Sequence, residues 1–179
     1  HAVDWVRYIL GDPKTQWVIG QVERKTDRYE RRQPIEDRSM GLIYFENDIR
    51  FLIESDLPNS QPGVVMCYGT EGTLKVGRND ITLFKNDKPG MKKMEFPDAR
   101  KTRHQYRAET AELISWMEGK TEHRGAALQA RSTMEILMAI YESSRNRGVV
   151  HMPLMTKESP LALMIKEGAL PVLVPGRYD

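Results

Sequence analysis

The chain has 179 residues, of which 40% are hydrophobic and 29% are charged, and its formal net charge is +2. These values are typical of one soluble globular domain: the charge is too small to indicate a nucleic-acid or anionic-membrane partner, and the apolar runs are too short to span a bilayer. The single cysteine, Cys67, excludes an internal disulfide framework and favours a reducing compartment, which predicts a cytoplasmic location.

The first eleven residues predict an amphipathic helix. Gly11 suits the position just after a helix end, and Asp12-Pro13 prevents the helix from continuing. No Ser, Thr, Asp or Asn cap and no initiating Met precede this helix, so we expect the natural protein to extend upstream of His1. The residues expected on its apolar flank are Ala2, Val6, Ile9 and Leu10.

Strands are predicted next. Residues 16–23 have strand character, and the charged run 24–38 is interpreted as a solvated loop. The clearest pattern is a hairpin, because residues 39–46 and 49–55 flank Asn47-Asp48, two residues that tolerate the left-handed backbone of a tight turn. The remaining segments are a loop at 56–62, strands at 64–70, 73–76 and 80–85, and a second solvated run at 85–101.

Both faces of the predicted sheet are apolar. Met40, Leu42 and Tyr44 alternate with Ile43 and Phe45 along one strand. A sheet with one wet face should alternate apolar and polar residues more cleanly, so we expect helices to cover one face and a neighbouring subunit or domain to cover the other. A later strand repeats the pattern, with Val64, Met66 and Tyr68 opposite Val65 and Cys67.

Helical periodicity begins at about residue 105. One helix is predicted to end at Gly119 and a second to run over 125–147, with Gly148 as its stop. Residues 149–154 are predicted to form a last strand, and 161–167 a short helix within a tail, 155–179, packed on the domain formed by 1–154. The buried stripe of the second helix is expected to comprise Ala127, Ala130, Met134, Leu137, Met138 and Tyr141. The predicted fold class is α+β: a mostly antiparallel open sheet with helices on one face and the other face available for oligomerisation.

No self-contained catalytic motif is present in the sequence. It has no Gly-x-Gly-x-x-Gly after a strand, no phosphate-binding loop and no Cys pair for zinc, so neither a cofactor nor a metal is predicted to bind this chain. The glycines at 69 and 72 lie in a hairpin with the wrong spacing for dinucleotide binding. Cys67 is interpreted as a packed thiol, and His151 as a core polar group.

His1 is the candidate that differs from the other histidines. Asp4 follows it by one helical turn and can hold an imidazole by a hydrogen bond, which biases the tautomer. The His-x-x-Asp pattern is common, however, and a tag remnant or an ordinary helix-end residue are the alternatives.

The order of the segments resembles one family. The segments are the helix with His1-x-x-Asp4 that ends Tyr8-Ile-Leu-Gly11, the hairpin 69–76, and the helix that ends Ala139-Ile-Tyr-Glu-Ser143 before the strand 149–154. Together they resemble the C-terminal domain of the glucose-fructose oxidoreductase, inositol dehydrogenase and rhizopine-catabolism (Gfo/Idh/MocA) family, over residues 1–154. The tail is similar to the endings of some sugar-dehydrogenase-like members.

The resemblance implies an activity and a site. Members have an N-terminal Rossmann domain that binds NAD or NADP, of which nothing is present here, and a C-terminal Asp-x-x-x-His-x-x-Asp segment that meets the substrate. His1 matches that His and Asp4 the later Asp. The resemblance implies that His1 is the catalytic acid/base, or the hydrogen-bonding anchor, for a substrate hydroxyl, and that Asp4 supports it. It also implies dimers or tetramers formed through the sheet face.

The leading hypothesis is therefore the C-terminal domain of an NAD(P)-dependent oxidoreductase for a sugar, polyol or related hydroxy compound, inactive in isolation. Its expected partners are that small molecule, an N-terminal Rossmann domain and further copies of the chain. Arg28 and Arg31 in the charged run could contact an acidic or phosphorylated substrate. The alternatives are a stand-alone binding or scaffold module without catalytic activity, and a stand-alone enzyme that uses residues 24–38 as an anion site.

Overall fold

The computed structural model describes residues 1–56, 64–77, 80–94 and 102–178. It divides into two compact units, one formed by His1–Asn59 with Arg124–Asp179 and the other by Ser60–His123. None of the helices in the described ranges combines the length and the apolar composition needed to cross a membrane. Helices and mostly antiparallel strands make up both units, which confirms the predicted α+β class.

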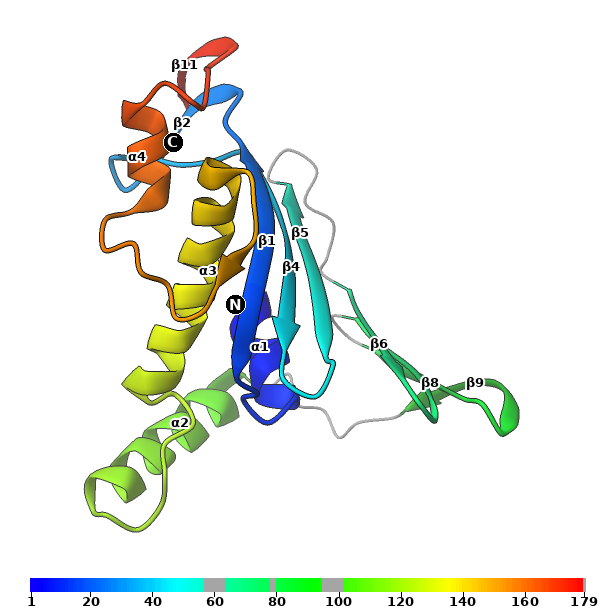
Figure 1. The fold of residues 1–179 in the computed structure, drawn as a ribbon. Helices are drawn as coiled ribbons and strands as arrows, with labels where there is room; N and C mark the ends of the chain where they lie inside the picture. Colours follow the sequence, from blue (N-terminus) through cyan, green and yellow to red (C-terminus); the bar gives the residue numbers. More distant parts are fainter. Residues whose placement is uncertain (57–63, 78–79, 95–101, 179) are drawn as a thin grey trace. The chain divides into compact units, whose positions relative to one another are not determined.

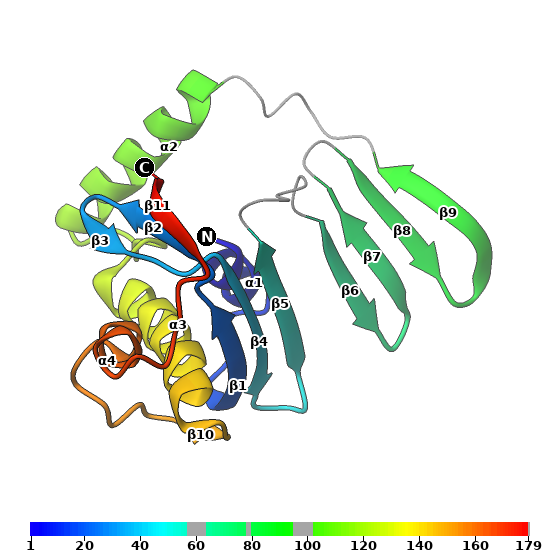
Figure 2. The ribbon, with the colours of Figure 1, turned by 90° about the horizontal axis from the view of Figure 1, so that it is seen from above.

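The first unit is built on a four-stranded antiparallel sheet in the order β10-β1-β4-β5. Helix α3 lies along one face of this sheet (Figures 1 and 2), and α4 packs on α3. A second, three-stranded sheet joins β2 and β3 to β11, which runs parallel to β2. The elements are α1 (Ala2–Ile9), β1 (Thr15–Glu23), β2 (Thr26–Glu30), β3 (Gln33–Pro34), β4 (Arg38–Phe45), β5 (Arg50–Asp56), α3 (Ala127–Asn146), β10 (Val150–His151), α4 (Pro160–Lys166) and β11 (Val174–Tyr178).

The core lies between α3 and the inner face of the four-stranded sheet. The cross-strand row Val18, Ile43 and Phe51 belongs to this face, and Ile136 and Ile140 pack against it from α3. The opposite face carries the row Ile19, Leu42 and Leu52, in which Ile19 is 42% and Leu52 is 69% exposed. One apolar face is thus covered by the chain's own helix, as the alternation along β4 predicts.

Two local predictions are confirmed in the backbone. Strands β4 and β5 form the expected hairpin, with Asn47 at φ 59° and Asp48 at φ 58°. Helix α1 ends before Gly11, which has φ 79°. Its buried flank differs from the prediction, because α1 buries Val3, Val6 and Arg7 and leaves Ala2 and Ile9 exposed.

The buried stripe predicted for α3 is right only in part, because Leu137 and Tyr141 pack against the core but its other members do not define the buried face. The helix buries Ile136, Ala139 and Ile140, whereas Ala127, Ala130 and Met134 are exposed and Leu137, Met138 and Tyr141 are half-buried. The buried face of α3 includes polar residues that form hydrogen bonds with other parts of the chain. A prediction from the apolar residues alone therefore places the buried face on the neighbouring side of the helix. These polar residues are Thr133, Glu142 and Ser143.

The solvated loop predicted at 24–38 is also wrong. This run forms the β2–β3 hairpin, and both Arg24 and Asp37 are buried. The tail supplies β11 to the free edge of β2. The division predicted at residue 154 stays a prediction.

The second unit contains an antiparallel sheet of β6 (Val65–Gly69), β7 (Gly72–Val76), β8 (Ile81–Lys85) and β9 (Lys88–Met94). It also contains α2 (Thr102–Met117), after which Gly119 adopts φ 71°, as the helix-end prediction requires. Strand β9 replaces part of the solvated run predicted at 85–101. The loop predicted at 56–62 lies outside the described residues from position 57 onward.

Candidate functional site

The N-terminal helix α1 is held on α3 by a buried arginine. Arg7 is only 5% exposed, and its Nη1 donates to the carbonyl oxygen of Gln129 and to Thr133 Oγ1, each at 2.8 Å. Its Nη2 lies 3.1 Å from Asp12 Oδ1, just beyond the end of α1. A buried charge is tolerated when it is paired and hydrogen-bonded; both Nη atoms of Arg7 meet these conditions, whereas its buried Nε has no hydrogen-bond partner among the described residues.

Asp4 joins the same group of contacts. Thr133 Oγ1 donates to Asp4 Oδ1 at 2.9 Å, so the threonine hydroxyl connects the Asp4 carboxylate to the Arg7 guanidinium. Sequence reasoning missed both Arg7 and Thr133. Arg7 recurs with Val3, Val6 and Leu10 at helical spacing, a signal of a buried cation, but no local pattern predicts a threonine 129 positions from Asp4.

His1 lies at the start of α1. The backbone carbonyl oxygen of His1 accepts a hydrogen bond from the Trp5 amide at 2.9 Å, and His1 is exposed to solvent. No side-chain capping bond from His1 is present in α1, and the Asp4 carboxylate is engaged by Thr133. The described residues show no hydrogen bond between the His1 imidazole and Asp4, so the predicted pairing is not formed here, and the catalytic role of the exposed His1 stays a prediction.

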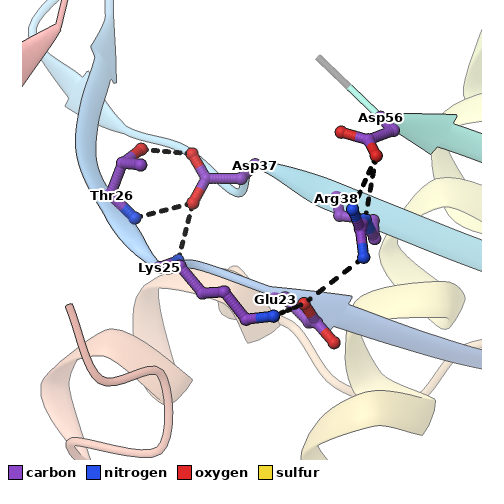
Figure 3. Close-up of polar contacts among 6 residues, drawn as sticks. All are labelled: Glu23, Lys25, Thr26, Asp37, Arg38 and Asp56. Atoms are coloured by element: carbon purple, nitrogen blue, oxygen red, sulfur yellow. Dashed lines mark hydrogen bonds and ion pairs between the residues drawn. The ribbon is translucent and has the colours of Figure 1, made fainter. Parts of the chain in front are cut away.

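Arg28 and Arg31 belong to the β2–β3 hairpin. Asp37 anchors this hairpin, as Figure 3 shows, because its Oδ2 accepts from the amides of Lys25 and Thr26 at 2.6 and 2.7 Å. Asp37 Oδ1 accepts from the Thr26 hydroxyl. Burial alone would raise the pKa of Asp37, but the hydrogen bonds from Thr26 and Lys25, with the charge of Arg28, hold it below its usual value.

The tip of this hairpin is open to solvent. Arg31 and Arg32 adopt positive φ angles of 48° and 68°, and the Arg31 side chain is 92% exposed. Arg31 Nε lies 3.7 Å from Glu30 Oε1, an exposed pair of small energetic value. The guanidinium of Arg31 is therefore accessible to an anion, whereas Arg28 is half-buried.

The structure does not bring the two pairs of predicted site residues together. Helix α1 precedes the first residue of β1, and the hairpin follows its last residue (Figure 1). Among the described residues, no hydrogen bond or ion pair joins His1 or Asp4 to Arg28 or Arg31, and the nine-residue strand β1 separates the two pairs in sequence.

Hollows in the described part of the first unit include one of about 680 Å³ and one of about 380 Å³. The larger lies between β1, the C-terminal end of α3 and the segment after α4, with Arg147 and Leu170 in its lining. The smaller lies beside Arg7, Asp12 and Glu135. His1, Asp4, Arg28 and Arg31 line neither.

The described residues do not fit a resident dinucleotide or metal. They hold no cluster of three or more His, Cys, Asp or Glu side chains that could bind a metal ion. Gly69 and Gly72 pair across the β6–β7 hairpin, and the parallel strand pair β2–β11 has no glycine-rich turn leading into a helix after β2. A glycine-rich turn of that kind is the feature that holds the pyrophosphate in a Rossmann-type dinucleotide site. His151, predicted to be a core polar group, is exposed.

Comparisons with solved structures place the fold. The chain resembles a putative oxidoreductase from Thermotoga maritima with 16% identity and a TM-score of 0.65, covering 85% of this chain and 45% of that one. It resembles the WlbA dehydrogenase from Bordetella pertussis, solved with NADH and UDP-GlcNAcA, with 19% identity and a TM-score of 0.62, covering 86% and 43%. It also resembles levoglucosan dehydrogenase, solved with NADH and levoglucosan, with 16% identity and a TM-score of 0.69, covering 84% of this chain and 48% of that one.

The chain spans less than half the length of each of these structures. A comparison with curated proteins gave no match. The sequence profile described as "Oxidoreductase family, C-terminal alpha/beta domain" matches residues 1–152, which is most of the chain and includes α1, the four-stranded sheet and α3. The protein therefore belongs to the Gfo/Idh/MocA oxidoreductase family, and residues 1–152 correspond to its C-terminal alpha/beta domain.

Proposed function

We propose that this chain is the substrate-binding and oligomerising domain of an NAD(P)-dependent oxidoreductase that acts on a sugar, polyol or related hydroxy compound. The observation that carries the proposal is the family match over residues 1–152, which includes α1 with His1 and Asp4 at its start. Two structural neighbours, WlbA and levoglucosan dehydrogenase, were solved with NADH and a carbohydrate, which supports this substrate class.

In this proposal His1 exchanges a proton with the substrate hydroxyl, and Asp4 supports it. An exposed imidazole at the start of a fixed helix suits that role, because it can reach a ligand while its backbone stays in place. Arg31, at the open tip of the hairpin, and Arg28 behind it would contact an acidic group on a larger substrate or on a substrate held by another copy. The cofactor site lies outside these 179 residues, and the chain alone is inactive. The proposed location is the cytoplasm.

The exposed sheet face is the proposed oligomer surface. Its central row, Ile19, Leu42 and Leu52, is flanked by the stacked rings of Trp17 and Tyr44, whose centroids are 4.7 Å apart. An apolar row with an aromatic pair beside it is the composition expected at the centre of a protein interface.

Two measurements test the proposed function. Titration of NADH and NADPH into the 179-residue chain, followed by nicotinamide fluorescence, should show no binding. The protein encoded by the complete reading frame should bind one of the two and oxidise at least one compound in a panel of sugars, polyols and sugar acids. A His1→Asn variant of that longer protein should bind the cofactor normally and lose about 100-fold or more in kcat.

Binding of NADH by the chain itself would contradict the assignment of the cofactor site. A complete reading frame without a dinucleotide-binding segment would contradict the oxidoreductase proposal and favour a stand-alone binding module.

A further inference from the structure

The Thr133 hydroxyl on α3 lies between two charged groups of α1. Thr133 is 7% exposed, and its Oγ1 lies 2.9 Å from Asp4 Oδ1 and 2.8 Å from Arg7 Nη1. Asp4 and Arg7 are three positions apart on α1, so both reach the same point on α3. These contacts connect the start of α1 to a helix that is far away in sequence.

The direction of the two hydrogen bonds is fixed by chemistry. A threonine hydroxyl has one proton to donate, and an arginine can only donate. Because Arg7 Nη1 donates to Thr133 Oγ1, the single hydroxyl proton is directed to Asp4 Oδ1, which as a carboxylate oxygen only accepts. The hydroxyl therefore cannot rotate to another partner without the loss of this part-buried hydrogen bond to Asp4.

Arg7 holds the Thr133 hydroxyl in place through contacts of its own. Its Nη1 also donates to the Gln129 carbonyl oxygen, and its Nη2 pairs with Asp12. The guanidinium is thus held by α3 on one side and by the turn after α1 on the other. Charge-assisted bonds of this kind are shorter and stronger than neutral ones, so the position of Thr133 Oγ1 is well defined.

We propose that Thr133 is a positioning residue for the His1–Asp4 pair: held by Arg7, its hydroxyl fixes the Asp4 carboxylate one helical turn from His1. This inference rests on the proposed function, in which His1 acts on the substrate hydroxyl. With one carboxylate oxygen held by Thr133, Asp4 is fixed in orientation on the first turn of α1, three positions after the exposed His1.

The test compares Thr133→Val, which keeps the shape but removes the hydroxyl, with Thr133→Ser, which keeps the hydroxyl. In the enzyme made from the complete reading frame, Thr133→Val should lower kcat about tenfold or more while KM changes by less than about threefold, since misplaced catalytic groups affect the chemical step. It should also move the lower limb of the pH profile of kcat/KM, whereas Thr133→Ser should stay within about threefold of wild type throughout.

A second measurement uses the 179-residue chain. The Thr133 hydroxyl proton should be visible by NMR as a slowly exchanging resonance close to the Asp4 β-protons, and it should vanish in Thr133→Val. Equal kinetics of the Val and Ser variants in an active enzyme, or no such proton in the wild-type chain, would overturn the inference and leave the oxidoreductase proposal standing. A complete wild-type enzyme inactive on the whole panel would overturn the proposed function and, with it, this role of Thr133.

Discussion

Gly20 of β1 and Ile140 of α3 meet backbone to backbone. A Cβ atom on Gly20 would lie 2.6 Å from Ile140 Cγ2 and 2.9 Å from both the Cα and the carbonyl oxygen of Ile140. Two of these three atoms belong to the backbone and cannot turn aside. This close approach of α3 to β1 therefore requires a residue without a side chain at position 20.

We predict that Gly20→Ala destabilises the fold by about 1–3 kcal/mol, because the added methyl group forces α3 away from the sheet. Urea unfolding followed by circular dichroism measures the change. Gly148→Ala is the matched control, since a Cβ there would meet only the Asn146 carbonyl oxygen at 3.9 Å. Equal stability of the two variants would show that α3 is not so closely packed on β1.

Glu142 near the C-terminal end of α3 should make stability depend on pH. The Arg145 guanidinium holds the pKa of Glu142 at about 2, assisted by the Thr156 hydroxyl and the Asn146 amide and opposed by burial. Since the folded-state pKa lies below the ordinary value of 4.5, the contribution is complete at neutral pH and is lost as the pH falls from about 4.5 to about 2.

Glu142→Gln should therefore cost about 3 kcal/mol at pH 7 and less than half of that at about pH 3, where the wild-type carboxylate is losing its advantage. Urea unfolding at both pH values gives the difference. Glu158→Gln, at an exposed position, is the control and should change stability little at either pH. A pH-independent difference between wild type and Glu142→Gln would exclude the ionised carboxylate as its cause.

Asp37 should determine whether the β2–β3 hairpin is ordered. It accepts three hydrogen bonds: Oδ2 accepts from two backbone amides, and Oδ1 accepts from one hydroxyl. An asparagine has only one side-chain oxygen and cannot accept at both positions. Asp37→Asn replaces one acceptor oxygen with a donor, so we expect a loss of about 1–3 kcal/mol. Hydrogen exchange should accelerate at residues 26–34, whereas Glu30→Gln, in an exposed pair, should leave the exchange unchanged.

The elements set by local chemistry could be predicted from the sequence. Asn47-Asp48 defines the β4–β5 hairpin and Gly11 the end of α1, because each adopts a backbone conformation that few residues tolerate. The β2–β3 hairpin could not be predicted in this way. It depends on Asp37 reaching back to Lys25 and Thr26 and on β11, which is supplied from the far end of the chain.

The candidate site shows the same limit. The position of His1 and Asp4 at the start of a helix follows from their spacing, but the contact of Asp4 with Thr133 depends on how α1 packs on α3. The α3 stripe was misassigned in part for a related reason: Thr133 and Ser143 are buried because they hydrogen-bond to Asp4 and to the Gly20 amide of β1, which are partners that helical periodicity does not include.

Leu52 should control self-association through the outer sheet face. It is 69% exposed and lies opposite Leu42, which in turn lies opposite Ile19, so a charge at position 52 falls at the end of the apolar row, on the edge strand β5. We expect sedimentation of the wild-type chain at high concentration to show dimers or larger species, and Leu52→Glu to be monomeric because a carboxylate cannot be buried there without a partner. The exposed Leu128 of α3 lies outside this sheet, and Leu128→Glu is the control that should keep the wild-type oligomer. A wild-type chain that stays monomeric, or a Leu52→Glu variant that still associates, would exclude this face as the interface.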